Sequence, residues 1–156
     1  AAPPALREQR AALIDACLDS QHLFAGTRIA IASDPDLLYT LAQLFTSLGA
    51  EIVTAVASTG RSSILKQLPV ERVLVSDLGD FEEEARSAGA QLLVTHSRGC
   101  MAAERLGVPL FRVGFPIFDR FGVQDRSWLG YAGTRRLVYE VANLLQPRWW
   151  SASLAT

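Results

Sequence analysis

The spacing of apolar residues along the chain predicts an alternation of strands and helices. Short, nearly continuous apolar segments are separated by segments in which apolar residues recur every three or four positions. A strand with apolar residues at successive positions is expected to be buried on both faces, as in a parallel sheet. The expected strands are Thr27–Ser33, Ala50–Val56, Arg72–Asp77, Gln91–His96 and Pro109–Gly114.

The segments between these strands are expected to be helical. After the first strand, Asp34 is expected to cap a helix, Pro35 suits its first position, and Gly49 is expected to close it. The other expected helices run from Leu6 to about His22–Gly26, over a short segment ended by Pro69, over Asp80–Ala88, over Ser97–Gly107, and up to Pro147.

This alternation predicts a Rossmann-like α/β fold, a three-layer sandwich around a parallel sheet of about five strands. An amphipathic N-terminal helix precedes the sheet and a C-terminal helix follows it. We expect residues 1–26 to form the leading helix, residues 27–147 the Rossmann-like domain and residues 148–156 an aromatic C-terminal tail. Such sheets bind ligands at the carboxyl ends of their strands, so residues just after a strand are the first candidates for a site.

Composition narrows the possible partners. The chain has 156 residues, 49% of them hydrophobic, which suits one well-buried domain. Its 15 Lys and Arg residues face 16 Asp and Glu residues, so no basic excess favours nucleic acid. No apolar run approaches the roughly 18 residues that span a bilayer, and the first residues lack the pattern of a signal peptide. We therefore expect a soluble, cytoplasmic protein that binds neither nucleic acid nor membrane.

The two cysteines, Cys17 and Cys100, lie far apart in segments expected to be helical. A disulfide framework is not indicated. Iron–sulfur clusters and structural zinc sites need more thiolate or imidazole ligands at closer spacing. Each cysteine is expected to be a buried or half-buried small apolar residue, and we expect no metal ligands in this chain.

The turns after the strands contain only short candidate motifs. No dinucleotide-binding glycine motif follows the first strand, whose turn instead carries two carboxylates. S-T-G at Ser58–Gly60 and S-R-G at Ser97–Gly99 could each hold an anion, although Ser97 could simply cap its helix. His96 could contact a ligand or partner, or only hydrogen-bond to the backbone. The candidate ligand-binding residues are His96, Ser97, Arg98 and Gly99; no catalytic residue is expected.

The segment Gly114–Gly122, G-F-P-I-F-D-R-F-G, is unusually rich in aromatic residues for a loop. Its rings must either cover the edge of their own sheet, with Asp119 capping a turn, or contact another protein. Aromatic and arginine enrichment favours a partner surface. The candidate interface residues are Phe115, Ile117, Phe118, Asp119, Arg120, Phe121, Trp128, Trp149 and Trp150.

The last third of the chain resembles the nitrogenase component 1 family. Gly107–Leu145 is similar to its C-terminal part, and most similar to the N subunits of the iron–molybdenum cofactor assembly scaffolds. The shared features are G-F-P-I-F-D-R at Gly114–Arg120, Arg126 before W-x-G-Y, G-T at Gly133–Thr134 and E-x-A-N at Glu140–Asn143. Segments upstream are also similar, so the resemblance covers nearly the whole chain.

The resemblance implies a role in nitrogen fixation. Scaffold subunits are built from three Rossmann-like domains, and two N and two E subunits hold a precursor of the iron–molybdenum cofactor while the nitrogenase iron protein helps to mature it. The cluster-binding cysteines lie in the N-terminal domain and the precursor is associated mainly with the E subunit. This chain is thus expected to hold no cofactor of its own, and its partners are expected to be the rest of its subunit, the E subunit and the iron protein.

Three functional hypotheses follow. The first is a structural, subunit-contacting domain of the scaffold's N subunit, without turnover of its own. The second is a domain of the beta-type nitrogenase subunit or a related oxidoreductase. That subunit shares G-F-P-x-F-D-R, but follows it with a histidine-rich stretch and G-Y-E-G where this chain has F-G-V-Q-D and G-Y-A-G-T, which favours the scaffold. The third is a small-molecule-binding domain that uses the His96–Gly99 turn.

Overall fold

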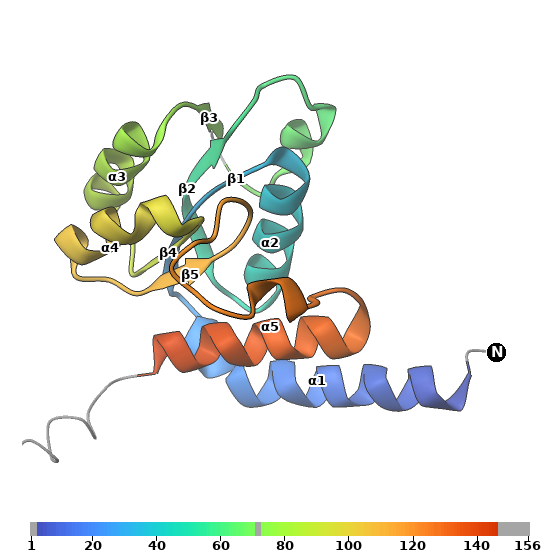
Figure 1. Ribbon diagram of the computed structural model, residues 1–156. Coiled ribbons are helices and arrows are strands. Elements are labelled where there is room, and N and C mark those ends of the chain that lie inside the picture. Colours follow the sequence, from blue (N-terminus) through green and yellow to red (C-terminus); the bar gives the residue numbers. More distant parts are fainter. Residues whose placement is uncertain (1–2, 71–72, 147–156) are drawn as a thin grey trace, which may run out of the picture.

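The fold is organised around a parallel sheet, which Figure 1 shows in the computed structural model; the structure describes residues 3–70 and 73–146. Within these ranges five strands pair in the order β3-β2-β1-β4-β5, and every neighbouring pair is parallel. They are β1 (Arg28–Ser33), β2 (Glu51–Ala57), β3 (Val73–Val75), β4 (Leu92–Thr95) and β5 (Leu110–Arg112). The predicted Rossmann-like α/β fold is confirmed, and the order of strands reverses between β1 and β4.

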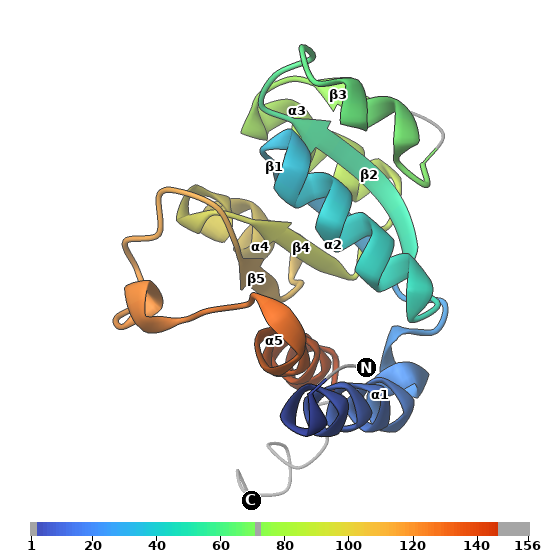
Figure 2. The same ribbon diagram turned by 90° about the vertical axis from the view of Figure 1, so that its right-hand side faces the viewer.

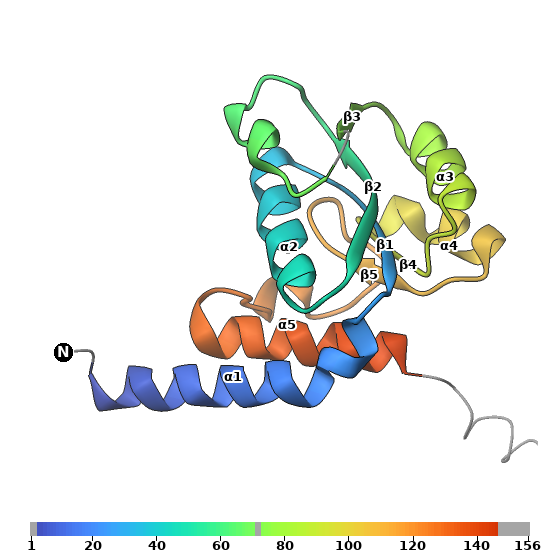
Figure 3. The same cartoon turned by 180° about the vertical axis from the view of Figure 1, so that it is seen from behind.

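Helices cover both faces of this sheet. They are α1 (Pro4–Phe24), α2 (Pro35–Ser47), α3 (Leu78–Ser87), α4 (Cys100–Leu106) and α5 (Gly130–Leu145), with shorter 3₁₀ turns η1 (Ser63–Gln67), η2 (Ser97–Gly99) and η3 (Val123–Asp125). The ribbon views place α3 and α4 on one face and α2 and α5 on the other (Figures 1 and 3). Helix α1 lies along α5, outside the sheet (Figure 2).

The alternation of side chains along each strand divides the core between the two faces. In β1, Ile29 and Ile31 belong to the larger buried cluster with α2 and α5, whereas Ala30 and Ala32 belong to the smaller cluster with α3 and α4. Phe24, at the end of α1, extends the larger cluster and stacks on Phe45 of α2 with ring centroids 5.9 Å apart. The leading helix is therefore joined to the domain by its last turn and by its contact with α5.

The ends of the helices differ in part from prediction. Pro35 opens α2 and Gly49 follows it with φ +92°, as expected. The prediction that Asp34 caps α2 is wrong, because its carboxylate accepts a hydrogen bond from Ser58 Oγ instead (2.7 Å) and caps no helical amide. Asp77 is the carboxylate that caps a helix: its Oδ1 accepts from the amides at the start of α3, which begins at Leu78 rather than Asp80.

Two other segments deviate from a regular α-helix. The short segment before Pro69 is the 3₁₀ turn η1, and the helix expected over Ser97–Gly107 begins as the 3₁₀ turn η2 before α4. Residues 147–156, including Trp149 and Trp150, lie outside the described residues, so the aromatic tail and the domain boundaries stay predictions. None of the described helices combines the length and apolar character that crossing a membrane requires.

Candidate functional site

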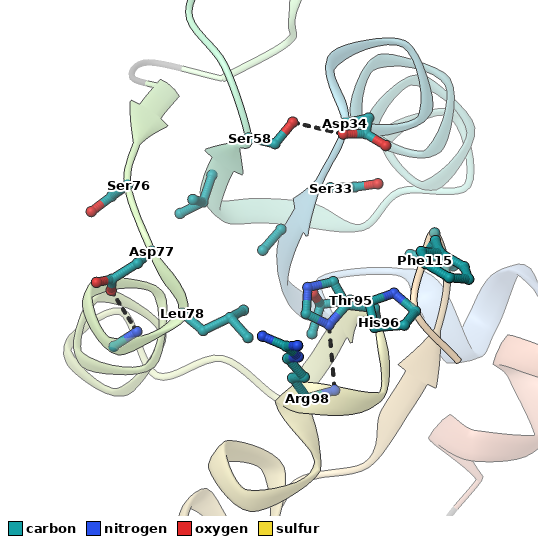
Figure 4. Close-up of a pocket in the computed structure, with 16 residues that line it drawn as sticks. Ser33, Asp34, Ser58, Ser76, Asp77, Leu78, Thr95, His96, Arg98 and Phe115 are labelled. Carbon is teal, nitrogen blue, oxygen red and sulfur yellow. Dashed lines mark hydrogen bonds between the residues drawn. The ribbon is translucent and has the colours of Figure 1, made fainter. Parts of the chain in front are cut away.

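The carboxyl ends of the strands surround a crevice with a volume of about 560 Å³. It lies where the strand order reverses, the usual ligand-binding position in open parallel sheets. Ser33 ends β1 and Asp34 follows it, Asp77 follows β3, and His96 follows β4 (Figure 4). Residues at and just after the ends of several strands therefore gather at one edge of the sheet.

His96 is held by the backbone of the next turn. Its Nδ1 accepts a hydrogen bond from the amide of Arg98 at 3.3 Å, as the backbone-bonded interpretation predicted. Partial burial, with the positive charge of Arg98, lowers the pKa of His96 below its usual value, although Asp34 acts in the opposite direction. A neutral ring whose Nδ1 accepts a hydrogen bond carries its proton on Nε2, so His96 can offer an N–H donor.

The other residues of the S-R-G turn separate into two groups. Arg98 lines the crevice with His96, whereas Ser97 and Gly99 are buried away from it. Gly99 packs against the methyl group of Thr95, where a Cβ would collide. Of the four candidate ligand-binding residues, only His96 and Arg98 line the crevice, because the turn buries Ser97 and Gly99; ligand binding at this turn stays a prediction.

Ser97 anchors the aromatic loop instead of capping its helix. Its hydroxyl donates to the Asp119 carboxylate and accepts from the amide of Phe118 at 3.1 Å. Its own amide donates to the carbonyl of Pro116 at 3.1 Å. The capping interpretation of Ser97 is therefore wrong, and the residue fixes the position of the loop that follows β5.

A partly buried ion pair completes this anchor. Arg112 of β5 donates to both carboxylate oxygens of Asp119, with Nε at 2.9 and 2.8 Å and Nη2 at 2.6 Å. The two side chains are only 17% and 25% exposed. The Asp119 carboxylate thus accepts from side chains of its own domain, so the prediction that it caps a turn is wrong. The residue is still exposed, and its contact with a partner stays a prediction. We call Ser97, Cys100, Arg112 and Asp119 the anchor cluster.

Cys100 takes part in this cluster through its thiol. Its Sγ donates to Asp119 Oδ2 at 2.9 Å and accepts from Arg112 Nη2 at 3.0 Å. Burial, followed by the hydrogen bond to Asp119, raises the thiol pKa, so the group stays protonated and can donate. The expectation of a simple apolar role is therefore wrong for Cys100.

The charges of the anchor cluster stabilise one another. Hydrogen bonds from Arg112, Cys100 and Ser97 hold the pKa of Asp119 well below its usual range. The hydrogen bonds that Arg112 donates to Asp119 in turn raise the pKa of Arg112. The carboxylate therefore stays ionised, and the loop is fixed to η2, α4 and β5 at once.

This fixed loop presents its rings to solvent. Phe115, Phe118 and Phe121 are 88%, 69% and 103% exposed, and Leu129 is 86% exposed. The alternative in which these rings cover their own sheet is therefore wrong for the three phenylalanines. Ile117 is half-buried and Arg120 exposed. Their role at an interface stays a prediction.

Trp128 belongs to the domain's own packing. Its ring lies against Phe111 of β5, with centroids 5.3 Å apart, and packs on the larger core cluster. The prediction that Trp128 contacts a partner is therefore not supported by its position. A Cβ at Gly133 would lie 2.8 Å from Ser127 O and 2.5 Å from Trp128 C, so a glycine lets α5 pass close to this segment.

Arg112 is a site residue that the sequence-based prediction missed. Its signal was a lone charge within the apolar segment P-L-F-R-V-G, since a charge in a buried strand needs a partner.

Within residues 3–70 and 73–146, no group of three or more His, Cys, Asp or Glu side chains is arranged to hold a metal ion.

Comparisons with known proteins agree with this architecture. The solved structure described as nitrogenase Cp1 at pH 6.5 has a chain that superposes with a TM-score of 0.85 and 29% identity, over 92% of this chain and 33% of that chain. Three relatives are each described as nitrogenase iron-molybdenum cofactor biosynthesis protein NifN. The relative from Sinorhizobium fredii is 52% identical over 98% of this chain, that from Rhodobacter capsulatus 48% over 92%, and that from Klebsiella pneumoniae 41% over 95%.

This chain spans about a third of the length of these relatives, 32%, 31% and 32% respectively. Residues 1–146 match the family described as nitrogenase component 1 type oxidoreductase. The match includes all of the described helices and strands and the loop that carries G-F-P-I-F-D-R. The chain therefore belongs to the nitrogenase component 1 type oxidoreductase family.

Proposed function

We propose that this chain is the C-terminal α/β domain of a scaffold subunit on which the iron–molybdenum cofactor of nitrogenase is assembled. The proposal is supported by its identity of 41–52% with the three NifN relatives over 92–98% of the chain. Its role there is structural, and the chain catalyses no reaction by itself.

The observation that carries the structural role is that exposed aromatic rings stand on a rigidly held loop. Phe118 follows directly on the half-buried Ile117, and its amide is bound by Ser97. Asp119, the next residue, is fixed by Arg112. A loop backbone that is already held in place loses little conformational freedom on binding, so such a surface suits a protein partner. Aromatic residues near the centre of an interface commonly contribute most of the binding free energy.

The partners follow from this assignment. The remaining domains of the same subunit and the E-type scaffold subunit are the proteins that the aromatic loop would contact. The iron protein of nitrogenase would act on the whole complex. The iron–sulfur clusters and the cofactor precursor belong to other parts of that complex, and we assign this chain no ligand for them.

A domain of a catalytic nitrogenase subunit is the second candidate, because the superposed chain comes from a structure described as nitrogenase. The two candidates differ in the subunit that the loop binds. A NifN-type subunit should assemble with an E-type subunit, and a beta-type subunit with the catalytic alpha-type subunit.

The test is assembly by a full-length NifN-type subunit carrying this domain. Phe118→Ala should weaken its association with the E-type subunit by at least about 30-fold, since a central aromatic contributes about 2 kcal/mol or more. Met101→Ala is the matched control, because Met101 is an exposed apolar residue (58%) on α4, outside the segment Gly114–Gly122. Unchanged assembly of the Phe118 variant would contradict the interface role. Preferred assembly with a catalytic alpha-type subunit would favour the second candidate.

A further inference from the structure

The crevice contains buried hydroxyl groups that nothing in the described residues satisfies. Thr95 is fully buried at the end of β4 and lines the crevice, and its Oγ1 has no hydrogen-bond partner there. Its methyl group faces Gly99, so the hydroxyl is directed elsewhere. Ser33 Oγ, at the end of β1, is buried and unpaired in the same way. Buried hydroxyl groups are normally hydrogen-bonded, so two such groups at one cavity indicate a place for a polar ligand.

Cationic and N–H donors lie beside these hydroxyl groups. Arg98 is exposed, lines the crevice, and its guanidinium pairs with no side chain in residues 3–70 and 73–146. His96 directs its Nδ1 to the backbone, which leaves Nε2–H for a ligand. Figure 4 shows both side chains beside the same part of the crevice. A guanidinium together with an N–H donor suits one carboxylate or phosphate group.

Two carboxylates limit the charge of the ligand. Asp34 is held by Ser58 through Oδ1, which leaves its second oxygen able to accept from a ligand hydroxyl. Asp77 also lines the crevice, with its Oδ1 bound to the first amides of α3. Two negative charges against one free guanidinium disfavour polyanions such as nucleoside triphosphates. The arrangement favours a ligand with a single anionic group and hydroxyl groups.

We propose that the crevice binds a small hydroxylated anion. Its anionic group contacts Arg98 and His96 Nε2–H, and its hydroxyl groups contact Asp34, Ser33 and Thr95. A hydroxy-carboxylate and a sugar phosphate share this chemistry. A ligand site of this kind goes beyond the proposed function. Phe115 lines the crevice as well as belonging to the aromatic loop, whereas Phe118 and Phe121 do not line it, so ligand binding and the Phe118 surface can be tested separately.

The test is calorimetric titration of the 156-residue chain with four probes: gluconate, ribose 5-phosphate, ribose and inorganic phosphate. Gluconate or ribose 5-phosphate should bind with a Kd below about 1 mM. Ribose lacks the anion and inorganic phosphate lacks the sugar hydroxyls, so each should bind at least about tenfold more weakly, the effect of losing one hydrogen bond or more. The tighter of the first two probes identifies the anionic group.

Two variants assign the binding to the crevice. Arg98→Ala should weaken it roughly tenfold to hundredfold, the effect of losing a charged hydrogen bond. Thr95→Val keeps the shape of the side chain and should weaken binding severalfold. Arg135→Ala is the control, because Arg135 is exposed on α5 and does not line the crevice. Far-ultraviolet circular dichroism checks that each variant is folded.

The outcomes decide the proposal. Binding of a hydroxylated anion that Arg98→Ala weakens and Arg135→Ala does not would support it. A Kd above about 1 mM for both gluconate and ribose 5-phosphate would overturn it. Equal affinity for inorganic phosphate, or equal affinity in the Arg98 variant, would also overturn it. Subunit assembly is measured separately, so failure here leaves the interface role of Phe118 to its own test.

Discussion

Replacing Asp119 by alanine should destabilise the domain, because it leaves Arg112 as an unpaired charge. The two side chains are 25% and 17% exposed, which places the pair between a surface ion pair and a fully buried one. Breaking a buried pair by removing one partner typically costs about 3–5 kcal/mol, and an exposed pair contributes at most about 1 kcal/mol. With a quarter or less of each side chain exposed, we expect a loss of about 2–4 kcal/mol in the free energy of unfolding.

Urea denaturation followed by far-ultraviolet circular dichroism measures this loss. The matched control is Asp125→Ala, since Asp125 is an exposed carboxylate in η3, close along the chain to the same loop, and should change stability by less than about 0.5 kcal/mol. The double variant Arg112→Ala with Asp119→Ala should recover part of the loss, because it removes the unpaired guanidinium. If Asp119→Ala and Asp125→Ala cost the same, the anchor cluster does not hold the loop as described.

Three further changes test the core, the interhelical ion pairs and the close approach at α5. Leu41→Ala, at a side chain 1% exposed in α2, should cost about 2–5 kcal/mol of domain stability, whereas Phe118→Ala should cost much less in the isolated chain. Equal losses of stability for the two variants, measured by urea denaturation, would contradict the interface role of Phe118. Hydrogen bonds from Arg105 lower the pKa of Glu82 from 4.5 to about 2, so the ionised carboxylate stabilises the fold above pH 4.5 and this contribution disappears as the pH falls toward 2. Glu82→Gln should therefore flatten the dependence of stability on pH in that window. An unchanged pH dependence would show that the ion pair of Glu82 with Arg105 does not stabilise the fold. Gly133→Ala should lower the thermal midpoint and cost about 1–3 kcal/mol, because its Cβ would meet the backbone of Trp128; a wild-type midpoint would mean that this segment yields easily.

The sheet could be predicted from the sequence because its signal is local. Each strand is a short apolar segment, and alternation with helices restricts the topology to a few parallel arrangements. Pro35 and Gly49 were placed correctly for the same reason, since their backbone preferences do not depend on distant residues.

Capping was harder to predict, because several carboxylates and hydroxyls compete for the same role. Asp34 and Asp77 each precede a helix, but only Asp77 caps one. Asp34 is bound by Ser58, a residue 24 positions away that the sheet brings close. Ser97 likewise looks like a cap in its local sequence, yet Asp119 and Phe118 occupy its hydroxyl.

The candidate site was predicted only in outline. The gathering of His96 and Arg98 at the sheet edge follows from topology, which the sequence indicates. The direction in which the Asp119 carboxylate points does not follow from topology. It depends on Arg112 in the preceding strand, and no spacing rule connects these two residues. The sequence does not show whether Phe118 is exposed or buried, since the same apolar loop suits either environment.

The position of β1 in the middle of the sheet affects how the domain forms during synthesis. Ile29 in β1 pairs with Leu92 in β4, so the centre of the sheet remains open on one side until more than 60 further residues have been translated. Helix α1 packs against α5, the last helix of the chain to be translated, so this contact forms later still. Since contacts between distant residues form late, the nascent domain should emerge from the ribosome with its first helix unpaired and one edge of its central strand uncovered. Chaperones that recognise apolar segments would therefore have their best opportunity before residue 130 leaves the exit tunnel.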